Sequence, residues 1–136
     1  LDVIDKTTFS DGALATLSAT LGDEVHNVGG ASNSGTAGYA YGGYHAGWDV
    51  LNKLTYSTDG NATIALSSAL ERYSVAGASN SGTAAYWYGG TRGTTHAAQN
   101  TILKTPYATD ATAALSAYIT IGATGNSSGF ANCESL

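Results

Sequence analysis

The sequence predicts an all-β protein built from repeated four-stranded units, and three observations lead to this fold class. An eight-residue segment, Gly30–Ala37, recurs without a change as Gly77–Ala84, 47 positions later. The chain holds 18 Gly and 9 Tyr, together with many Thr and Asn, and all four residue types have low helix propensity. Short stretches alternate between apolar and polar residues, as β-strands do, and no apolar stripe with the helical period is sustained.

The repeat extends over nearly the whole chain. Further identities at the offset of 47 positions are Asp2-Val3 with Asp49-Val50, Lys6 with Lys53, and Tyr41-Gly42-Gly43 with Tyr88-Gly89-Gly90. A weaker third copy follows at an offset of 51 positions, where Lys104, Tyr107 and Thr109-Asp110 correspond to Lys53, Tyr56 and Thr58-Asp59. A fixed period of this length is typical of repeat architectures. We therefore interpret residues 1–136 as a single repeat domain with units at about 1–47, 48–98 and 99–136.

Each unit is expected to contain four short strands. In the second unit these strands are residues 51–57, 62–66, 73–78 and 83–88. Turn signals at Thr58–Asn61 and Asn80–Gly82 separate them, and Gly89-Gly90 ends the last one. One alternative stays open, because residues 62–72 could instead form about two turns of helix.

The order of the strands predicts how the units are arranged. We name the strands of a unit by position: the first precedes the Asn-Ser-Gly turn, the second ends at Tyr-Gly-Gly, the third carries a lysine and the fourth is rich in Ala and Leu. The chain then begins with a third and a fourth strand, residues 1 to about 20, and ends with a first and a second strand, about 121–136. We expect these halves to complete one sheet, as terminal strands do in ring-shaped β-propellers. About three blades are too few to close a ring, so we expect a dimer of six blades, or additional sequence, to complete it.

Three aromatic residues occupy the same position after the third strand of each unit: Phe9, Tyr56 and Tyr107. Alternation along the strands places them on one face. We expect each to hold its unit against the neighbouring unit.

The units resemble blades of kelch-type β-propellers, in which a Gly-Gly pair closes the second strand. The segments Lys53–Thr63, Leu70-Glu71-Arg72 and Ala85–Gly90 are more closely similar to the kelch-like repeats of bacteriophage structural and fibre proteins. The chain departs from the kelch pattern in lacking a Trp late in the unit. The resemblance covers nearly the whole chain, and it implies a virion or surface-associated scaffold that binds through its loops. It implies no reaction.

Composition excludes several classes of partner. Only 11% of residues are charged, and the formal net charge is -5. A chain with this balance has no basic surface to neutralise nucleic-acid phosphates or to hold an anionic membrane, and no apolar run is long enough to insert into a bilayer. Cys133 is the single cysteine, so no internal disulfide is expected. It is either a small residue near a strand end or a site of pairing between chains. Low charge and many hydroxyl groups favour a virion or another extracellular location.

Candidate site residues lie in the loops that follow the Gly-Gly pairs. The ligand-binding candidates are Tyr44, His45, Trp48, Arg92 and His96. Aromatic rings with hydroxyl, imidazole and guanidinium groups are typical of sugar-binding sites. The alternative is that Trp48 packs between units and that the histidines are merely solvated. We expect Gly42, Gly43, Gly89, Gly90, Tyr41 and Tyr88 to have structural roles in the repeat.

No catalytic motif, metal-ligand spacing or phosphate-binding loop is present in the sequence, so we expect no enzymatic activity, no cofactor and no metal. The leading hypothesis is a structural or assembly protein of a virion, such as a capsid, tail or fibre component, which binds a second copy of itself or other virion proteins. The alternative is a β-propeller lectin that binds glycans. A further alternative is a domain of a larger enzyme whose catalytic residues lie elsewhere.

Overall fold

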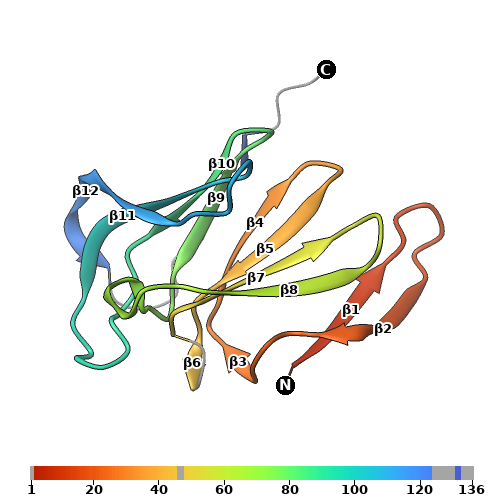
Figure 1. Ribbon diagram of the computed structural model, residues 1–136, viewed down its shortest axis with the longest axis horizontal. Helices are drawn as coiled ribbons and strands as arrows, with labels where there is room; N and C mark the ends of the chain where they lie inside the picture. The colour runs from red at the N-terminus through yellow and green to blue at the C-terminus, as the bar shows by residue number, and fades with distance from the viewer. Residues whose placement is uncertain (1, 46–47, 124–130, 133–136) are drawn as a thin grey trace.

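The computed structural model describes residues 2–45, 48–123 and 131–132, and these residues form thirteen strands and no α-helix (Figure 1). The strands are β1 (Val3–Thr7), β2 (Leu14–Thr20), β3 (Val25–His26), β4 (Gly29–Asn33), β5 (Ala37–Tyr41), β6 (Tyr44–His45), β7 (Val50–Thr55), β8 (Gly60–Ala65), β9 (Ala76–Asn80), β10 (Ala84–Tyr88), β11 (Gln99–Pro106), β12 (Ala113–Ala123) and β13 (Ala131–Asn132). The predicted all-β class is therefore confirmed.

Two four-stranded antiparallel meanders form most of the molecule. The middle sheet has the order β4-β5-β7-β8, and the C-terminal sheet repeats it as β9-β10-β11-β12. The register repeats as well, because Ala31 pairs with Tyr39 in the middle sheet and Ala78 pairs with Tyr86 in the C-terminal sheet. These four residues are related by the offset of 47 positions, so the sequence repeat corresponds to a repeated sheet. The prediction of four-stranded antiparallel sheets is confirmed for these two. From here on a unit means one sheet, so the sheet of β1 and β2 is the first unit, the middle sheet the second and the C-terminal sheet the third.

Local sequence explains where the strands turn. The tight turns before β5 and β10 contain Gly35 and Gly82, whose φ angles are +71° and +72°, a region that glycine adopts without steric cost. Residues 62–72, for which the sequence allows a strand or a helix, form no α-helix. They are strand up to Ala65, and Ser68–Leu70 forms a short 3-10 turn, η1, which begins after the capping residue Ser67.

The sheets stack face to face in chain order, with the N-terminal sheet (β1-β2) and the C-terminal sheet on opposite faces of the middle sheet (Figure 1). Strands β4 and β9 run side by side, and a Cβ on Gly77 would collide with the carbonyl oxygen of Gly30. The Ser32 amide donates to Ser79 Oγ at 2.7 Å across this contact. The core lies between the middle and C-terminal sheets and consists of Ala37, Tyr39, Tyr41, Leu51, Val75, Ala85, Trp87, Leu103 and Tyr107.

The same ion pair recurs at both contacts between sheets. Lys6 Nζ lies 2.7 Å from Asp59 Oδ1 between the N-terminal and middle sheets. Lys53 Nζ lies 2.6 Å from Asp110 Oδ2 between the middle and C-terminal sheets. In each case a lysine of a third strand reaches the turn that follows the third strand of the next unit. Repetition of the contact means that successive units stack in the same manner.

The predicted sharing of one sheet by the two ends of the chain is wrong for the residues that are described. Strand β1 pairs with β2 in a sheet of their own, and β13 instead pairs in parallel with the free edge of β9, with Ala131 opposite Ser79. Strand β12 also continues to Ala123, so the expected start of a new unit near residue 121 still belongs to the fourth strand of the third unit. The described strands form no closed ring, and Cys133 lies outside them.

The aromatic residues after the third strands behave differently from one another. Tyr107 is 8% exposed, and its ring stacks on Tyr39 of the preceding unit with centroids 5.2 Å apart. Tyr56 is 39% exposed and shares a hydrogen bond with Ser32 in its own sheet. Phe9 is 99% exposed. Within the described chain, therefore, only Tyr107 holds two units together as predicted.

Candidate binding site in the loops after the glycine pairs

The loops that follow the Gly-Gly pairs are held against the connector that precedes the first strand of the same unit. In the first loop, β3 pairs with β6, so that His26 lies opposite Tyr44. In the next unit a single bridge joins Tyr73 to Thr91. Both residues of the second bridge lie 47 positions after those of the first. The repeat therefore places the two loops in equivalent positions on adjacent sheets.

The glycine pairs allow the chain to turn close to these connectors. Gly42 and Gly43 have φ angles of +71° and +130°, and Gly89 and Gly90 have φ angles of +60° and +82°. A Cβ on Gly90 would lie 2.7 Å from the carbonyl oxygen of Tyr73, so a larger residue would displace the connector. The tyrosines before the pairs differ in burial: Tyr41 is fully buried, whereas Tyr88 is half-buried. Burial raises the pKa of both phenols.

Five side chains form one group, which we call the rim cluster: His26, Tyr44, Trp48, Tyr73 and His96. Tyr44 is at its centre, with ring centroids 5.2 Å from His26, 5.1 Å from Tyr73 and 6.5 Å from Trp48. Tyr73 continues the cluster to His96, whose Nδ1 lies 3.2 Å from the Tyr73 hydroxyl. Tyr44 is 39% exposed. The cluster can therefore offer an aromatic ring to a ligand, with imidazole and hydroxyl groups beside it for hydrogen bonds.

Trp48 packs between units. Its ring lies against Gly93 in the following loop so closely that a Cβ on Gly93 would collide with it. The residue is only half-buried, but its ring is used to join the two loops. This contact matches the alternative interpretation of Trp48 and leaves Tyr44 as the more accessible aromatic residue.

Arg92 is engaged in a partly buried polar contact. Its Nε donates to Glu71 Oε1 at 3.1 Å, and the Thr94 amide donates to the same oxygen at 3.2 Å. The Thr94 hydroxyl donates to this oxygen as well. Glu71 is only 6% exposed, and these bonds, that of the Thr94 hydroxyl above all, lower the pKa of its carboxyl group. The contact fixes the conformation of the second loop and uses part of the hydrogen-bonding capacity of Arg92.

A second buried charge lies under the same loop. Arg72 is 2% exposed and donates to the carbonyl oxygens of Gly89 at 3.1 Å and Thr101 at 2.9 Å. Burial lowers the pKa of its guanidinium group. Because Arg72 joins the end of β10 to β11, it stiffens the base of the second loop.

His45 and His96 each lie eight residues before an aligned lysine, Lys53 or Lys104, which predicts equivalent positions for them, but the structure does not place them equivalently. The bridges align Tyr44 with Thr91, and therefore align His45 with Arg92. His96 lies in a four-residue insertion that is closed by hydrogen bonds between Arg92 and Ala97 and between His96 and Arg92. The offset changes from 47 to 51 positions at this insertion. The backbone of His45 pairs with Val25, and its side chain lies outside the described part of the structure.

The structure thus brings Tyr44, Trp48 and His96 together and places Arg92 beside them in contact with Glu71. Sequence reasoning missed His26, Tyr73 and Glu71 as members of the site. The offset of 47 positions relates His26 to Tyr73 and Glu24 to Glu71, so the repeat itself contained the signal.

Among the described residues, no group of three or more His, Cys, Asp or Glu side chains could hold a metal ion. No helix in that part of the chain is long and apolar enough to cross a membrane. Comparisons with models of known protein families and with curated proteins found no match.

Proposed function

We propose that this chain is a non-enzymatic structural module of a virion or another extracellular structure, and that it assembles by stacking kelch-like blades. The observation that carries the proposal is the repeated contact between sheets. Each unit presents one face to the preceding unit and the opposite face to the next, and the same lysine–aspartate pair joins them twice. Units that stack by a repeated contact can continue the stack with further units.

The outer face of the C-terminal sheet carries the same residue types as the face of the middle sheet that contacts the C-terminal sheet. Tyr86 and Lys104 occupy the positions of Tyr39 and Lys53, and in both sheets the lysine lies above the tyrosine ring, at 5.8 Å and 5.6 Å from its centroid. Tyr39 is buried under the next unit, and Lys53 bonds to Asp110 of that unit. Tyr86 and Lys104 remain partly exposed.

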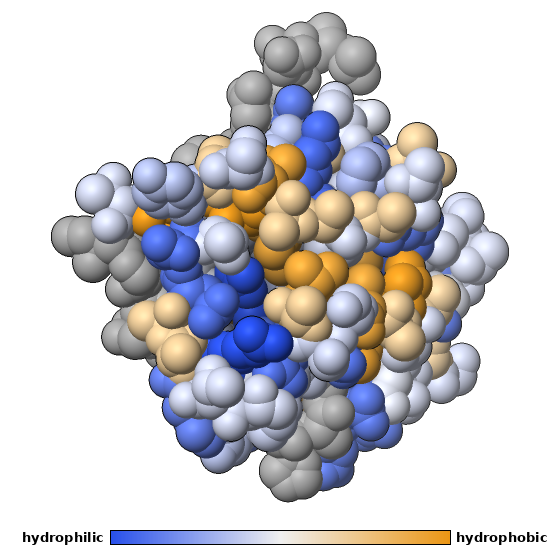
Figure 2. All heavy atoms as spheres, turned by 60° about the vertical axis from the view of Figure 1, so that its left-hand side comes forward, coloured by the Kyte–Doolittle hydropathy of each residue, from blue (hydrophilic) through white to orange (hydrophobic). Residues whose placement is uncertain are grey.

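The N-terminal sheet presents the complementary face. Its exposed apolar side chains are Val3, Phe9 and Leu14, which are 47%, 99% and 69% exposed. Phe9 occupies the position of Tyr107, which packs on Tyr39 within the chain. Figure 2, which turns the left-hand side of Figure 1 forward, shows a band of apolar side chains across the middle and right of the view. The two ends of the stack therefore fit a contact between copies of the chain, with the C-terminal sheet of one copy against the N-terminal sheet of the next.

The mass of the native chain tests this proposal. Light scattering over a range of protein concentrations should show reversible association, and Phe9→Asp should weaken it by placing a charge in the contact. Ser10→Asp, in the same exposed turn, is the matched control and should associate as the unchanged chain does. A chain that stays monomeric at every concentration would contradict the proposal.

The second candidate function is carbohydrate binding, which the exposed ring of Tyr44 in the rim cluster favours. Aromatic rings beside hydrogen-bonding groups stack on the apolar faces of sugars. A glycan array should then show saturable binding that Tyr44→Ala abolishes and that Glu24→Gln, a substitution at an exposed site outside the cluster, leaves unchanged. Absence of binding to any glycan would exclude this function.

A further inference from the structure

We propose that the free edge of β1, with the hollows beside it, is a seat for a β-hairpin of the chain's own repeat type, contributed by another polypeptide. The inference rests on the proposed function in one respect, namely that the units stack as blades. It goes further in naming which two strands would extend the β1-β2 sheet and the chemistry of the segment that would supply them.

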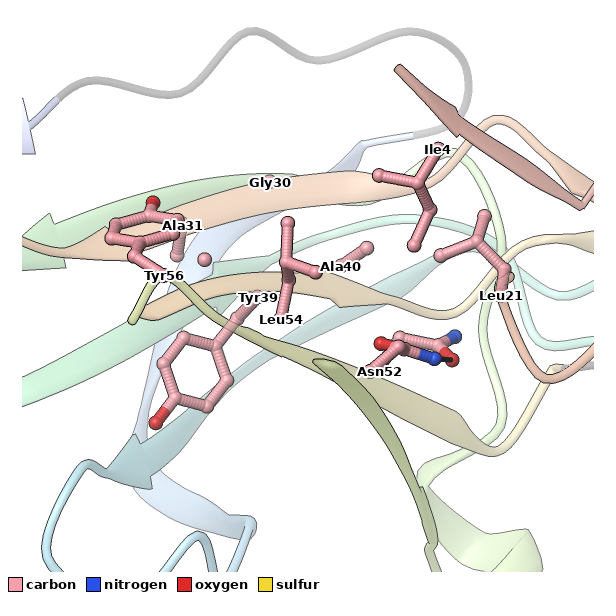
Figure 3. Close-up of a pocket in the computed structure, with 11 residues that line it drawn as sticks. Ile4, Leu21, Gly30, Ala31, Tyr39, Ala40, Asn52, Leu54 and Tyr56 are labelled. Carbon is pink, nitrogen blue, oxygen red and sulfur yellow. Dashed lines mark hydrogen bonds between the residues drawn. The ribbon is translucent and has the colours of Figure 1, made fainter. Parts of the chain in front are cut away.

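The seat consists of two hollows between the N-terminal sheet and the middle sheet. The first has a volume of about 270 Å³ and is lined by apolar side chains from both sheets, including Ile4, Leu21 and Leu54 (Figure 3). The second has a volume of about 470 Å³ and lies between Phe9 and Tyr56. Strand β1 contributes residues to both hollows, and among the described strands it pairs only with β2. Its other edge is therefore open to a further strand.

The next unit shows what fills the corresponding space. The lining positions Ala40, Asn52, Leu54 and Tyr56 of the middle sheet correspond to Trp87, Leu103, Thr105 and Tyr107 of the C-terminal sheet. The exposed fractions of the latter four residues are 0%, 0%, 0% and 8%. Trp87 and Tyr107 are covered by β4 and β5, the hairpin formed by the first two strands of the preceding unit, whose Tyr41 and Tyr39 rings lie against them. A hairpin of this type is thus the element that covers this face elsewhere in the same molecule.

The aromatic residue after the third strand is buried where such a hairpin lies against it and exposed where none does. Tyr107 is 8% exposed because the β4-β5 hairpin lies against it, with the Tyr39 ring stacked on its ring and the Ser32 carbonyl oxygen accepting from its hydroxyl at 3.1 Å. Tyr56, which faces the hollow, is 39% exposed. The hairpin that we propose would stack a tyrosine on Tyr56 in the same way.

The contacts of β4 and β5 define the chemistry of the occupant. Its first strand must consist of small residues, because the first strands of adjacent units approach as closely as Gly30 and Gly77 do. Its second strand should carry two tyrosines on the face toward the middle sheet, as Tyr39 and Tyr41 do toward the C-terminal sheet. The backbone of that second strand would pair with β1, because the second strand pairs with the third in both complete units. Addition of a strand to a free edge supplies main-chain hydrogen bonds, and the side chains supply specificity.

A synthetic peptide of residues 29–43, which contains β4, its turn, β5 and the glycine pair, is the probe. A fluorescent form of this peptide should bind the purified chain saturably. A control peptide with Tyr39→Ser and Tyr41→Ser should bind at least about tenfold more weakly, a loss of about 1.4 kcal/mol.

Variants of the protein locate the binding. Ala40→Arg places a charge in the first hollow and should reduce the affinity about tenfold or more, whereas Ser116→Arg, on the exposed part of β12, should leave it unchanged. Tyr56→Ser is a second, milder variant for use if Ala40→Arg does not fold by circular dichroism. Hydrogen exchange should show new protection of the amides of residues 3–7 when the peptide is added, because that edge gains strand partners. Failure of the peptide to bind, or binding that neither variant weakens, would overturn the inference.

The outcomes for this inference and for the proposed function can be told apart. A chain that stays monomeric but binds the peptide contradicts assembly by self-stacking and supports the hairpin seat. A chain that associates but does not bind the peptide contradicts only the hairpin seat.

Discussion

The two contacts between sheets differ in how they are filled, although they use the same polar pair. Between the middle and C-terminal sheets, aromatic rings fill the space, with Tyr41 lying 5.2 Å from Trp87 and both residues fully buried. Between the N-terminal and middle sheets, Ala40 occupies the position of Trp87, and a hollow remains. The lysine–aspartate pairs have nearly the same length in both places, 2.6 Å and 2.7 Å. Polar contacts therefore set how the units align, whereas apolar filling depends on the hairpin of the preceding unit.

The two lysine–aspartate pairs also differ in how far their side chains are exposed. The side chains of Lys53 and Asp110 are 25% and 23% exposed, but those of Lys6 and Asp59 are 46% and 36% exposed. Asp110 also accepts from the Tyr39 hydroxyl at 2.8 Å. The ion pair in the filled contact is less exposed to water, so the same two residue types contribute more to stability there.

The largest expected effect on stability comes from removing the Trp87 ring from the contact between the middle and C-terminal sheets. Trp87→Ala removes a fully buried ring and its Nε1 hydrogen bond to Thr105 Oγ1, and it should lower the free energy of unfolding by about 3–5 kcal/mol. Phe9→Ala, at the other end of the stack, should change it by less than about 0.5 kcal/mol. Urea unfolding followed by circular dichroism measures both values. A loss below about 1 kcal/mol for Trp87→Ala would mean that this contact is not the core.

A smaller effect is expected at the carboxylate under the second loop. Glu71→Gln should lower the free energy of unfolding by about 1–3 kcal/mol, because the charged acceptor of three hydrogen bonds is lost. Glu24→Gln, at the same position of the preceding unit but exposed, should have almost no effect.

The pH dependence of the unfolding free energy gives a second test of Glu71→Gln. Because the pKa of Glu71 is lowered from 4.5, its stabilisation is present above pH 4.5 and is lost as the pH falls through the lowered value. Urea unfolding in a series of acidic buffers should therefore show less loss of stability with Glu71→Gln than with the unchanged chain. Equal losses in the two proteins would contradict the role of Glu71.

The two ion pairs can be compared directly by replacing the aspartate of each with asparagine. Asp110→Asn should cost about 1–2 kcal/mol, since it weakens contacts to both Lys53 and Tyr39 in a partly buried place. Asp59→Asn should cost no more than about 0.5 kcal/mol, because its pair with Lys6 is more exposed. Asparagine tolerates the positive φ angles of both positions, +56° and +54°. Equal costs, measured by chemical unfolding, would mean that burial does not distinguish the pairs.

At neutral pH, an effect smaller than that of Asp110→Asn is expected for loss of the Tyr39 hydroxyl, which donates to Asp110. Tyr39→Phe should cost about 1 kcal/mol at pH 7, the value of one hydrogen bond. Burial, together with the hydrogen bond to Asp110, raises the pKa of Tyr39 from 10.0 to about 12. The hydrogen bond to Asp110 also raises the pKa of Lys53.

Raised pKa values make the folded state bind more protons than the unfolded state, so stability is lost as the pH rises from about 10 to about 12. Tyr39→Phe should therefore make the alkaline part of the stability profile flatter, which thermal unfolding in a pH series measures. An unchanged slope would show that Tyr39 does not titrate with folding.

Much of the fold could be predicted because its signals are local. Strand alternation and the turn glycines depend on neighbouring residues, and they placed β7, β8, β9 and β10 to within a few residues. The same local signals left residues 62–72 ambiguous, because small residues with Leu70 fit a strand, a turn or a short helix. Packing decided between them, and Ile64 and Leu66 lie against the core.

The candidate site could be predicted only in part. The positions of Tyr44, Trp48 and His96 after glycine pairs indicated that they lie in loops, and their mutual distances depend on how adjacent sheets stack. Tyr73 joins them only because its connector bridges to Thr91 across the turn made by Gly89 and Gly90. No local signal reports such a contact between distant segments.

By itself, the sequence determined that this chain forms antiparallel sheets of four strands, because the preferences of glycine, tyrosine and alternating residues act within a few positions. The tertiary structure decided which faces are covered. Phe9, Tyr56 and Tyr107 occupy the same position in the repeat, yet they are 99%, 39% and 8% exposed. Burial depends on which sheet packs against a face, and identical positions in a repeated sequence do not show which copy has such a neighbour.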